Sequence, residues 1–581
     1  MILKCFYFYM LILFGLLYLP MGVYAIDIYF ENGIIYTADQ QNKVVEALAV
    51  KDGRIAFVGS ANDGAPYKEA AKEVINLGGK MMMPGMIDGH IHTGSGPDFI
   101  LIGLENVDEA MNVIKEYVNS NPEQETYFGV GYQNAWFEGE EFENGPRKER
   151  LDEISDKPIL IFSFDGHAAW LNSKAFELLN ITRDTVSTPG GMIVKDENGE
   201  LWGTLYDTAM SFAAGFPTDE EKDLAFLREF LQGLNALGYT TINVIPGNGF
   251  FPVNWQMFQN LMDNNELTMR VRGAGLISSW RTEEDIDLLV TLSGEYNSSL
   301  LKLIQAKFFL DGVVDNESAL LLEPYANSHE HYGQAGWESQ DLNEAVAAVN
   351  RMGFPVHMHT IGDAAVRMGL DAVEYSRAQG NEIRNTLTHL QLVAESDFPR
   401  FYELGVIVVA NPYWHYKAPN HWELEEYAVL GERAEREYPL KSFLDNNAVL
   451  AFASDFPVTP MPNPFLAIQA GVTRNLVDDS TYDLPDITNM DDPRYLLWPE
   501  ERLDVIQMVR GFTIDAAYAL YEEDETGSLE VGKSADMIII DRDLLTIDPL
   551  DIKNINVLST YFQGKLVYDS TYLFEDGKFI S

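Results

Sequence analysis

Two histidines separated by one residue, His90 and His92, follow shortly after Pro84 and Gly85, two residues that interrupt regular secondary structure. On an extended strand, residues i and i+2 point to the same face, so these two imidazoles would share one face of a strand. Imidazole is the commonest metal-binding side chain. Because this spacing also arises by chance, a metal site depends on whether further ligands follow other strands.

Further polar residues follow apolar runs in the second half of the chain, namely Lys307, His359, His389 and Asp455. A single histidine on an apolar strand is usually a core residue with a hydrogen-bond partner, since buried polar groups need one. Here four of the ten histidines and an aspartate all come at the ends of apolar runs. This pattern predicts one shared metal site with nitrogen and oxygen ligands.

The elements that would position these residues alternate between short apolar strands and amphipathic helices. Besides the strand that carries His90, the predicted strands are residues 240–245, 269–276, 303–310, 355–359, 386–390, 406–410 and 449–454. Strand–helix alternation implies right-handed crossovers and a parallel sheet, and eight strands suit a closed (β/α)8 barrel of the TIM type. Catalytic groups of such barrels lie at the C-terminal ends of the strands, which is where these residues fall.

The rest of the chain is predicted to form three further parts. Residues 26–83 and 526–581 are rich in short strands and would together form a small β-sandwich domain, which leaves residues 84–525 for the barrel. The segment 95–235 is too long for a loop and holds its own strands and helices. We expect it to be an inserted cap subdomain at one end of the barrel.

The N-terminal 25 residues form a separate segment. Lys4 is the only charge before Asp27, and Val23-Tyr24-Ala25 fits a small-residue cleavage site after an apolar run. We predict a signal peptide over residues 1–25 and an exported protein, periplasmic or secreted. The alternative is an uncleaved membrane anchor, because the apolar run approaches the ~20 residues of a spanning helix. Cleavage after Ala25 would remove Cys5, the only cysteine, and would exclude thiolate catalysis.

The chain is strongly acidic, with 89 Asp and Glu residues against 40 Lys and Arg residues and a formal net charge of −49. This charge argues against nucleic acid or an anionic membrane surface as a partner. A small-molecule substrate is the expected partner.

These motifs resemble the amidohydrolase superfamily, and within it amidohydrolase family 3, which includes the N-substituted formamide deformylases. The matching segments are residues 84–92, Phe308-Phe309-Leu310-Asp311-Gly312, His359-Thr360-Ile361-Gly362-Asp363, Thr388-His389-Leu390-Gln391, Ser454-Asp455-Phe456-Pro457-Val458, residues 527–536, and Ser163-Phe164-Asp165-Gly166-His167 with Leu171-Asn172-Ser173 behind it. The resemblance spans essentially everything after the leader and implies a metal-dependent hydrolase that is a homodimer.

The resemblance also implies roles for single residues. His90 and His92 would bind one metal, His359 and His389 a second, and Lys307 would bridge the two as a carbamate. Asp455 would contact the metal and transfer protons. Two zinc ions are expected, with manganese, iron or nickel as alternatives. An unmodified Lys307, whose usual role would be a surface ion pair, would leave a one-metal or loosely bridged site.

Further residues are candidates for substrate contact, namely His167, Tyr132, Trp136, Tyr325, His415 and Arg474. His167 is also a candidate catalytic residue, as an oxyanion stabiliser that reaches over the metals. The alternatives are packing for His167 and the aromatic residues, and a surface ion pair for Arg474. His357, two residues before His359, would either support a metal ligand or fill the core.

The resulting prediction is a metal-dependent enzyme that hydrolyses a carbon–nitrogen bond other than a peptide bond in a small amide. Metal-activated hydroxide would attack the carbonyl, and Asp455 would pass the proton to the leaving nitrogen. Tyr132, Trp136 and Phe137 favour an apolar or aromatic N-substituent. The alternatives are an esterase, lactonase or phosphoesterase on the same barrel, and a non-catalytic binding or regulatory protein.

Overall fold

The computed structural model describes residues 25–164, 166–247, 253–419, 421–459, 461–477, 484 and 487–571. The predicted signal peptide, residues 1–25, lies outside these ranges apart from Ala25, and so does Asp165 of the motif before His167. Within these ranges, none of the helices combines the length and the apolar character that a membrane-spanning helix needs.

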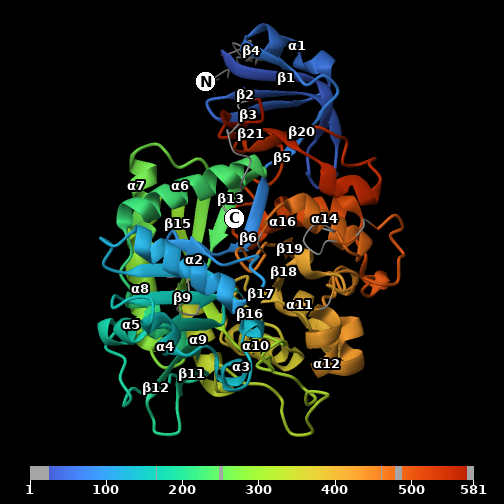
Figure 1. The fold of residues 1–581 in the computed structure, drawn as a ribbon. Coiled ribbons are helices and arrows are strands. Elements are labelled where there is room, and N and C mark those ends of the chain that lie inside the picture. The colour runs from blue at the N-terminus through green and yellow to red at the C-terminus, as the bar shows by residue number, and fades with distance from the viewer. Residues whose placement is uncertain are drawn as a thin grey trace, which may run out of the picture.

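Eight parallel strands form the central sheet of the molecule (Figure 1). Their order is β6 (Met86–Ile91), β13 (Tyr239–Val244), β14 (Arg270–Leu276), β15 (Leu301–Phe309), β16 (Val356–Thr360), β17 (Thr386–His389), β18 (Ile407–Ala410) and β19 (Leu450–Phe452). The first and last strands meet through bonds just beyond β19, where the backbone N–H of Asp455 donates to His90 O at 2.9 Å and the N–H of His92 donates to Phe456 O at 2.9 Å. The sheet is therefore a nearly closed barrel, which confirms the predicted (β/α)8 fold.

Helices cover the outside of this barrel because each has one apolar face. In α10 (Asp363–Ala378), Val366, Leu370 and Val373 recur at helical spacing and are buried in the main hydrophobic core. The preceding helix, α9 (Ser339–Arg351), buries a similar stripe. The other outer helices include α6 (Glu220–Ala236), α7 (Trp255–Asp263), α8 (Thr282–Glu295), α11 (Phe398–Leu404), α14 (Pro464–Thr473), α15 (Val505–Gly511) and α16 (Ile514–Ala519).

The segment between β6 and β13 contains a second sheet with its own hydrophobic core. The strand order is β11 (Gly191–Lys195), β12 (Leu201–Asp207), β10 (Ala168–Leu171), β9 (Ile159–Ser163), β8 (Tyr127–Tyr132) and β7 (Phe99–Ile100). Helix α2 (Val107–Ser120) packs Ala110 and Ile114 against one face of this sheet. Figure 1 shows the segment, in light blue to teal, toward the end of the molecule away from the terminal sheet.

The terminal sheet combines strands from both ends of the described chain. It contains β1 (Ile26–Tyr36), β2 (Val44–Lys51), β3 (Arg54–Gly59), β4 (Ala71–Asn76), β5 (Met81–Pro84), β20 (Met537–Ile540), β21 (Val557–Phe562) and β22 (Lys565–Asp569). The two sets meet where β5 pairs antiparallel with β20, with Met83 opposite Ile538. The strands of residues 26–83 are interrupted by a helix, α1 (Ala61–Glu69), which was not predicted.

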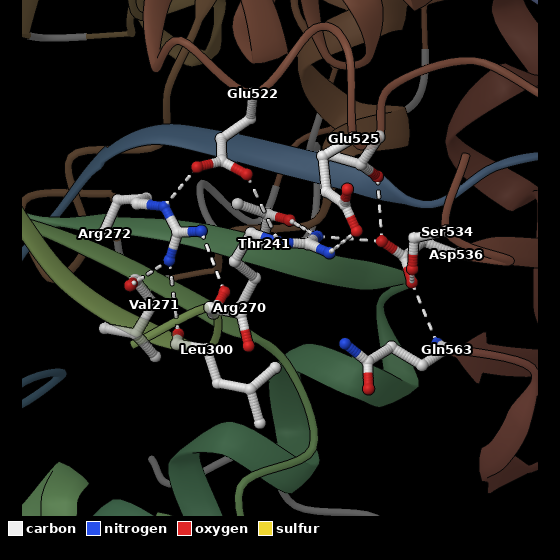
Figure 2. A network of polar contacts seen from close by, with 12 residues as sticks. Thr241, Arg270, Val271, Arg272, Leu300, Glu522, Glu525, Ser534, Asp536 and Gln563 are labelled. Carbon is white, nitrogen blue, oxygen red and sulfur yellow. Dashed lines mark hydrogen bonds and ion pairs between the residues drawn. The ribbon is translucent and has the colours of Figure 1, made fainter. Parts of the chain in front are cut away.

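A buried ionic network joins this terminal sheet to the start of barrel strand β14 (Figure 2). Arg270 donates to Asp536 Oδ2 at 2.8 Å, and Arg272 donates to Glu522 Oε1 at 2.7 Å. Arg270 is only 1% exposed. Asp536 also accepts hydrogen bonds from the Ser534 hydroxyl and the Gln563 N–H. The network holds the C-terminal segment against the N-terminal ends of the barrel strands, opposite the end that carries the predicted metal ligands.

Candidate metal centre

Three imidazoles lie beside one carboxylate at the C-terminal ends of the barrel strands, and a fourth adjoins them. Asp455 Oδ1 lies 3.2 Å from His90 Nε2 and 3.0 Å from His92 Nε2, and Asp455 Oδ2 lies 3.8 Å from His389 Nδ1. The ring of His359 is 4.6 Å from that of His389, measured between centroids. The structure thus brings together the five residues that were predicted from separate strand ends.

Backbone geometry aims these side chains. His389 and Asp455 have φ angles of 76° and 58°, in the left-handed region that residues with a β-carbon rarely adopt. Such a conformation costs about 1–3 kcal/mol per residue and tends to persist at functional sites. At Gly89, a β-carbon would come within 2.9 Å of Phe452 O, so only glycine lets β6 approach β19 this closely.

A shell of hydrogen bonds orients the imidazoles. His92 Nδ1 lies 2.8 Å from Ile245 O, and His389 Nδ1 lies 2.9 Å from Asn411 Oδ1. His90 Nδ1 lies 2.8 Å from His357 Nε2, so His357 supports a neighbouring imidazole rather than merely filling the core. Partners on one ring nitrogen fix the tautomer and leave the other nitrogen for a ligand, as is usual for metal-binding histidines.

Burial favours the neutral form of three of these imidazoles. The pKa values of His90, His359 and His389 lie well below their usual range because the rings are buried and adjoin one another and Lys307. A neutral imidazole is the form that binds a metal.

Lys307 is completely buried, which rules out the surface ion pair considered above. Its Nζ atom has no hydrogen-bond partner and lies 4.4 Å from the ring centroid of Phe309. Burial lowers the pKa of Lys307 to about 7. A buried amine without a hydrogen-bond partner needs an explanation, and a covalent modification or a bound ligand would provide one.

The residues fit a divalent cation. His90 Nε2, Asp455 Oδ1 and Lys307 Nζ are all buried without a hydrogen-bond partner, although the first two atoms are 3.2 Å apart. His90, His389 and Asp455 each offer one ligand atom, and these atoms lie within 4.8 Å of one another. Nitrogen and oxygen donors of this kind suit zinc and several other divalent metals.

His167 approaches this centre from the inserted segment. Its Nδ1 lies 2.8 Å from Asp207 Oδ1, at the end of β12. Both residues line a pocket with Phe309, Asp311 and Trp337 at the mouth of the barrel. Asp207 was not predicted, because nothing in its sequence context shows that β12 ends beside His167.

Asp311 organises the loops at the mouth. It accepts hydrogen bonds from the backbone N–H groups of Leu320, Ile361 and Gly362, and it lies 3.8 Å from His359 Nε2. Its position in the motif that follows Lys307 had suggested importance but no specific role. The structure shows that it ties the segment after β15 to the segment after β16.

The other candidates for substrate contact lie outside this pocket in the described structure. Tyr132 is buried in the core of the inserted segment against Phe137 and Trp170, and Trp136 is half-buried against the same core. Tyr325 is also buried, and its hydroxyl donates to Ala319 O at 2.9 Å. These positions favour packing over substrate contact.

His415 and Arg474 are completely buried. The ring of His415 stacks on Tyr438 at 4.8 Å. Arg474 donates to the backbone carbonyls of Glu437, Tyr438 and Leu497, so it binds neither a surface carboxylate nor the pocket. Its role here is to hold two segments of backbone together.

Comparisons with known proteins agree with this geometry. A model described as the amidohydrolase family matches residues 73–568. The chain is 30% identical over 570 residues to Protein LONG AFTER FAR-RED 3 of Arabidopsis thaliana, covering 94% of this chain and 92% of the relative. It is 25% identical over 576 residues to the N-substituted formamide deformylase of Arthrobacter pascens, covering 94% and 99%.

The fold has a solved counterpart. A crystal structure titled as an uncharacterized metal-dependent hydrolase from Pyrococcus horikoshii OT3 superposes with a TM-score of 0.69 and 22% identity, covering 90% of this chain and 99% of that chain. At this identity the likeness concerns the fold alone.

Proposed function

Because this chain belongs to the amidohydrolase family, we propose that it is an exported metal-dependent hydrolase that cleaves a non-peptide carbon–nitrogen bond in a small amide. The observation that carries the proposal is the group of four imidazoles around Asp455 at the barrel mouth. A relative named for the deformylation of N-substituted formamides supports a small amide as substrate. Export rests on the predicted signal peptide.

His90, His92, His359, His389 and Asp455 would hold one or two divalent ions, zinc in the first instance. Such an ion, when bound, supplies a Lewis acid that polarises a carbonyl and makes water nucleophilic near neutral pH. We also propose that Lys307 is carbamylated and would in that form supply oxygen ligands to the same ions. In that reaction the Lys307 nitrogen bonds to the carbon of CO2 and releases a proton, which turns a buried amine without a partner into an anion with two oxygen ligands.

Asp455 is the proton-transfer residue of this proposal. Its carboxylate has two oxygens among the imidazoles, so one could bind a metal ion while the other accepts the proton of the attacking water. The same carboxyl group then returns the proton to the leaving nitrogen when the carbon–nitrogen bond breaks.

His167 stabilises the oxygen of the carbonyl that is attacked. Asp207 Oδ1 lies 2.8 Å from its Nδ1, which orients the ring. With a proton on Nε2, the ring would donate a hydrogen bond to the negative charge that develops on the oxygen. In this way the inserted segment contributes to the chemistry of the barrel.

The pocket beside His167 is suited to an apolar or aromatic N-substituent. Phe309, Trp280, Trp337 and Leu276 line it. These residues take the place of the aromatic residues of the inserted segment that had first suggested such a substituent.

A substrate panel tests the proposal. N-substituted formamides, acylated amines and cyclic amides should be hydrolysed by metal-loaded protein, best with aromatic N-substituents, and chelation should abolish the turnover. Asp455→Asn should lose most of its turnover, whereas the exposed Asp341→Asn serves as the matched control and should keep full activity. Turnover confined to esters, lactones or phosphoesters would refute the bond class, and metal-loaded protein that turns over none of these compounds would favour a binding protein.

A further inference from the structure

A second group of metal-ligating side chains lies apart from the histidines around Asp455. Asp315 follows strand β15, and His421 and Glu426 lie in the long segment after β18. Each offers one ligand atom, and these atoms lie within 4.8 Å of one another. The proposed function uses none of these residues.

The geometry of His421 is that of a metal ligand. Its Nδ1 lies 3.3 Å from Glu425 Oε2, while its Nε2 lies 3.7 Å from Asp315 Oδ1 and 3.9 Å from Glu426 Oε1. The latter two separations are too long for hydrogen bonds. Two ligand atoms that bind one tetrahedral zinc ion at about 2.1 Å are about 3.4 Å apart, close to the separations seen. A carboxylate on the opposite ring nitrogen is the usual support of a metal-bound histidine.

An unusual helix brings two of these ligands together. Residues Trp422–Glu426 form a π-helix directly after His421. In an α-helix, residues i and i+5 lie roughly 140° apart around the axis, because each residue turns about 100°. The wider π-helical turn brings His421 and Glu426 toward one side, and such turns are frequent at functional sites.

A further buried carboxyl group, that of Glu437, adjoins Glu426. The Gln391 amide donates both to Glu426 Oε1 at 3.1 Å and to Glu437 Oε1 at 2.6 Å. Glu437 is 0% exposed, and its Oε2 atom has no hydrogen-bond partner, although the Trp422 indole lies near this carboxylate. A fully buried carboxylate oxygen without a partner is costly and is expected to have a ligand.

Two nearby cations have other partners. Lys417 pairs with Glu435, and the guanidinium of Arg474 donates to backbone carbonyls. The imidazole of His421 lies within 4 Å of carboxylate oxygens of Asp315, Glu425 and Glu426.

We propose that Asp315, His421 and Glu426 bind a divalent metal ion of the zinc type at a site separate from the histidines around Asp455. Glu425 positions His421, and Glu437 shares the Gln391 amide with Glu426. A ligand set with an imidazole suits Zn²⁺ or Mn²⁺, whereas Ca²⁺ and Mg²⁺ prefer oxygen ligands alone. The ion would tie the segment after β15 to the segment after β18. Through Gln391, two residues after His389, it would also stiffen the mouth of the barrel.

Metal analysis of the full chain tests this site. Protein purified without chelator and loaded with Zn²⁺ should hold one equivalent per chain more than His421→Ala or Glu426→Gln. His329→Ala, an exposed histidine outside the group, is the matched control and should lose no metal. Glu425→Gln should weaken the same site by roughly 10- to 100-fold, as the loss of such supporting carboxylates generally does. Zinc-edge diffraction should give an anomalous peak beside His421 Nε2.

A double variant separates this site from the proposed catalytic one. His90→Ala with His389→Ala should keep the equivalent at His421 whether or not the barrel site proves catalytic. If His421→Ala does not fold in the presence of chelator, the zinc stoichiometry and affinity of Glu426→Gln and Glu425→Gln test the site instead. Zinc stoichiometry and affinity equal to wild type in those two variants would overturn the proposal. The proposal would also be overturned if those two variants kept their metal content but bound alkylammonium ions more weakly than wild type. That result would favour a site for an organic cation.

Discussion

Removal of the His357 imidazole is expected to weaken metal binding at His90. His357 Nε2 lies 2.8 Å from His90 Nδ1, and His357 Nδ1 lies 2.7 Å from the Thr386 hydroxyl. In His357→Ala, His90 Nδ1 keeps only the Thr388 hydroxyl, 3.4 Å away, at the limit of a hydrogen bond. The ring would lose its fixed orientation and tautomer.

The size of the effect follows from the buried nitrogen that is left behind. An unsatisfied buried polar group costs about 1–3 kcal/mol. Because about 1.4 kcal/mol corresponds to a factor of ten, metal affinity should fall roughly 5- to 140-fold. Loss of a hydrogen-bond partner behind a metal ligand generally costs ~10- to 100-fold, which agrees with this range.

Competition with a chromophoric chelator measures this affinity on protein stripped of metal. His357→Gln, which keeps a polar side chain beside His90, should lose less than His357→Ala. Gln305→Ala is the matched control, because Gln305 is buried in the same barrel and bonds to Asn243 rather than to a predicted ligand. If His357→Ala binds metal within twofold of wild type, His357 does not position His90 and the reasoning fails.

Three further predictions concern proton transfer, the inserted segment and the ionic network. Asp455→Asn should retain metal but lower kcat by about 10²- to 10⁴-fold, and rates measured with metal content on the same sample decide this. Asp207→Asn should lower kcat by roughly 10²-fold with metal content unchanged, since His167 would lose the carboxylate on Nδ1, and an unchanged kcat would leave His167 a packing residue. Asp536→Ala should lower the free energy of unfolding by about 3 kcal/mol in urea titrations, because Arg270 would lose its nearest carboxylate and breaking a buried ion pair generally costs about 3–5 kcal/mol. A loss of stability below about 1 kcal/mol would contradict this prediction.

The barrel and the grouping of the histidines with Asp455 were predictable because their pattern is local. A short apolar run followed directly by His359, His389 or Asp455 is visible within about ten residues of sequence, and the barrel fold brings such strand ends together. The support of His90 by His357 and the pairing of His167 with Asp207 depend on contacts between distant segments. No spacing within one segment could show them.

Other differences have equally specific causes. Helix α1 contains Gly64 and Pro66, both poor helix formers, yet the Ser60 side chain caps its first turn by accepting from Asp63 N–H. Arg474 looks like a surface cation in sequence, but backbone carbonyls of distant residues satisfy it in the interior. Aromatic residues such as Tyr132 show only their apolar character in sequence, so substrate contact and core packing cannot be distinguished there.

The pairing of β5 with β20 sets an order in which the molecule can fold during synthesis. A ribosome releases β5 long before β20, and until then β5 has an open edge of unpaired backbone groups. Arg270 likewise lacks its Asp536 partner until the C-terminal segment has been synthesised. The barrel strands all precede β20, so they can assemble while the terminal sheet is still incomplete. Contacts between such distant segments generally form slowly, so we expect this sheet to close last and to be the part most exposed to mispairing.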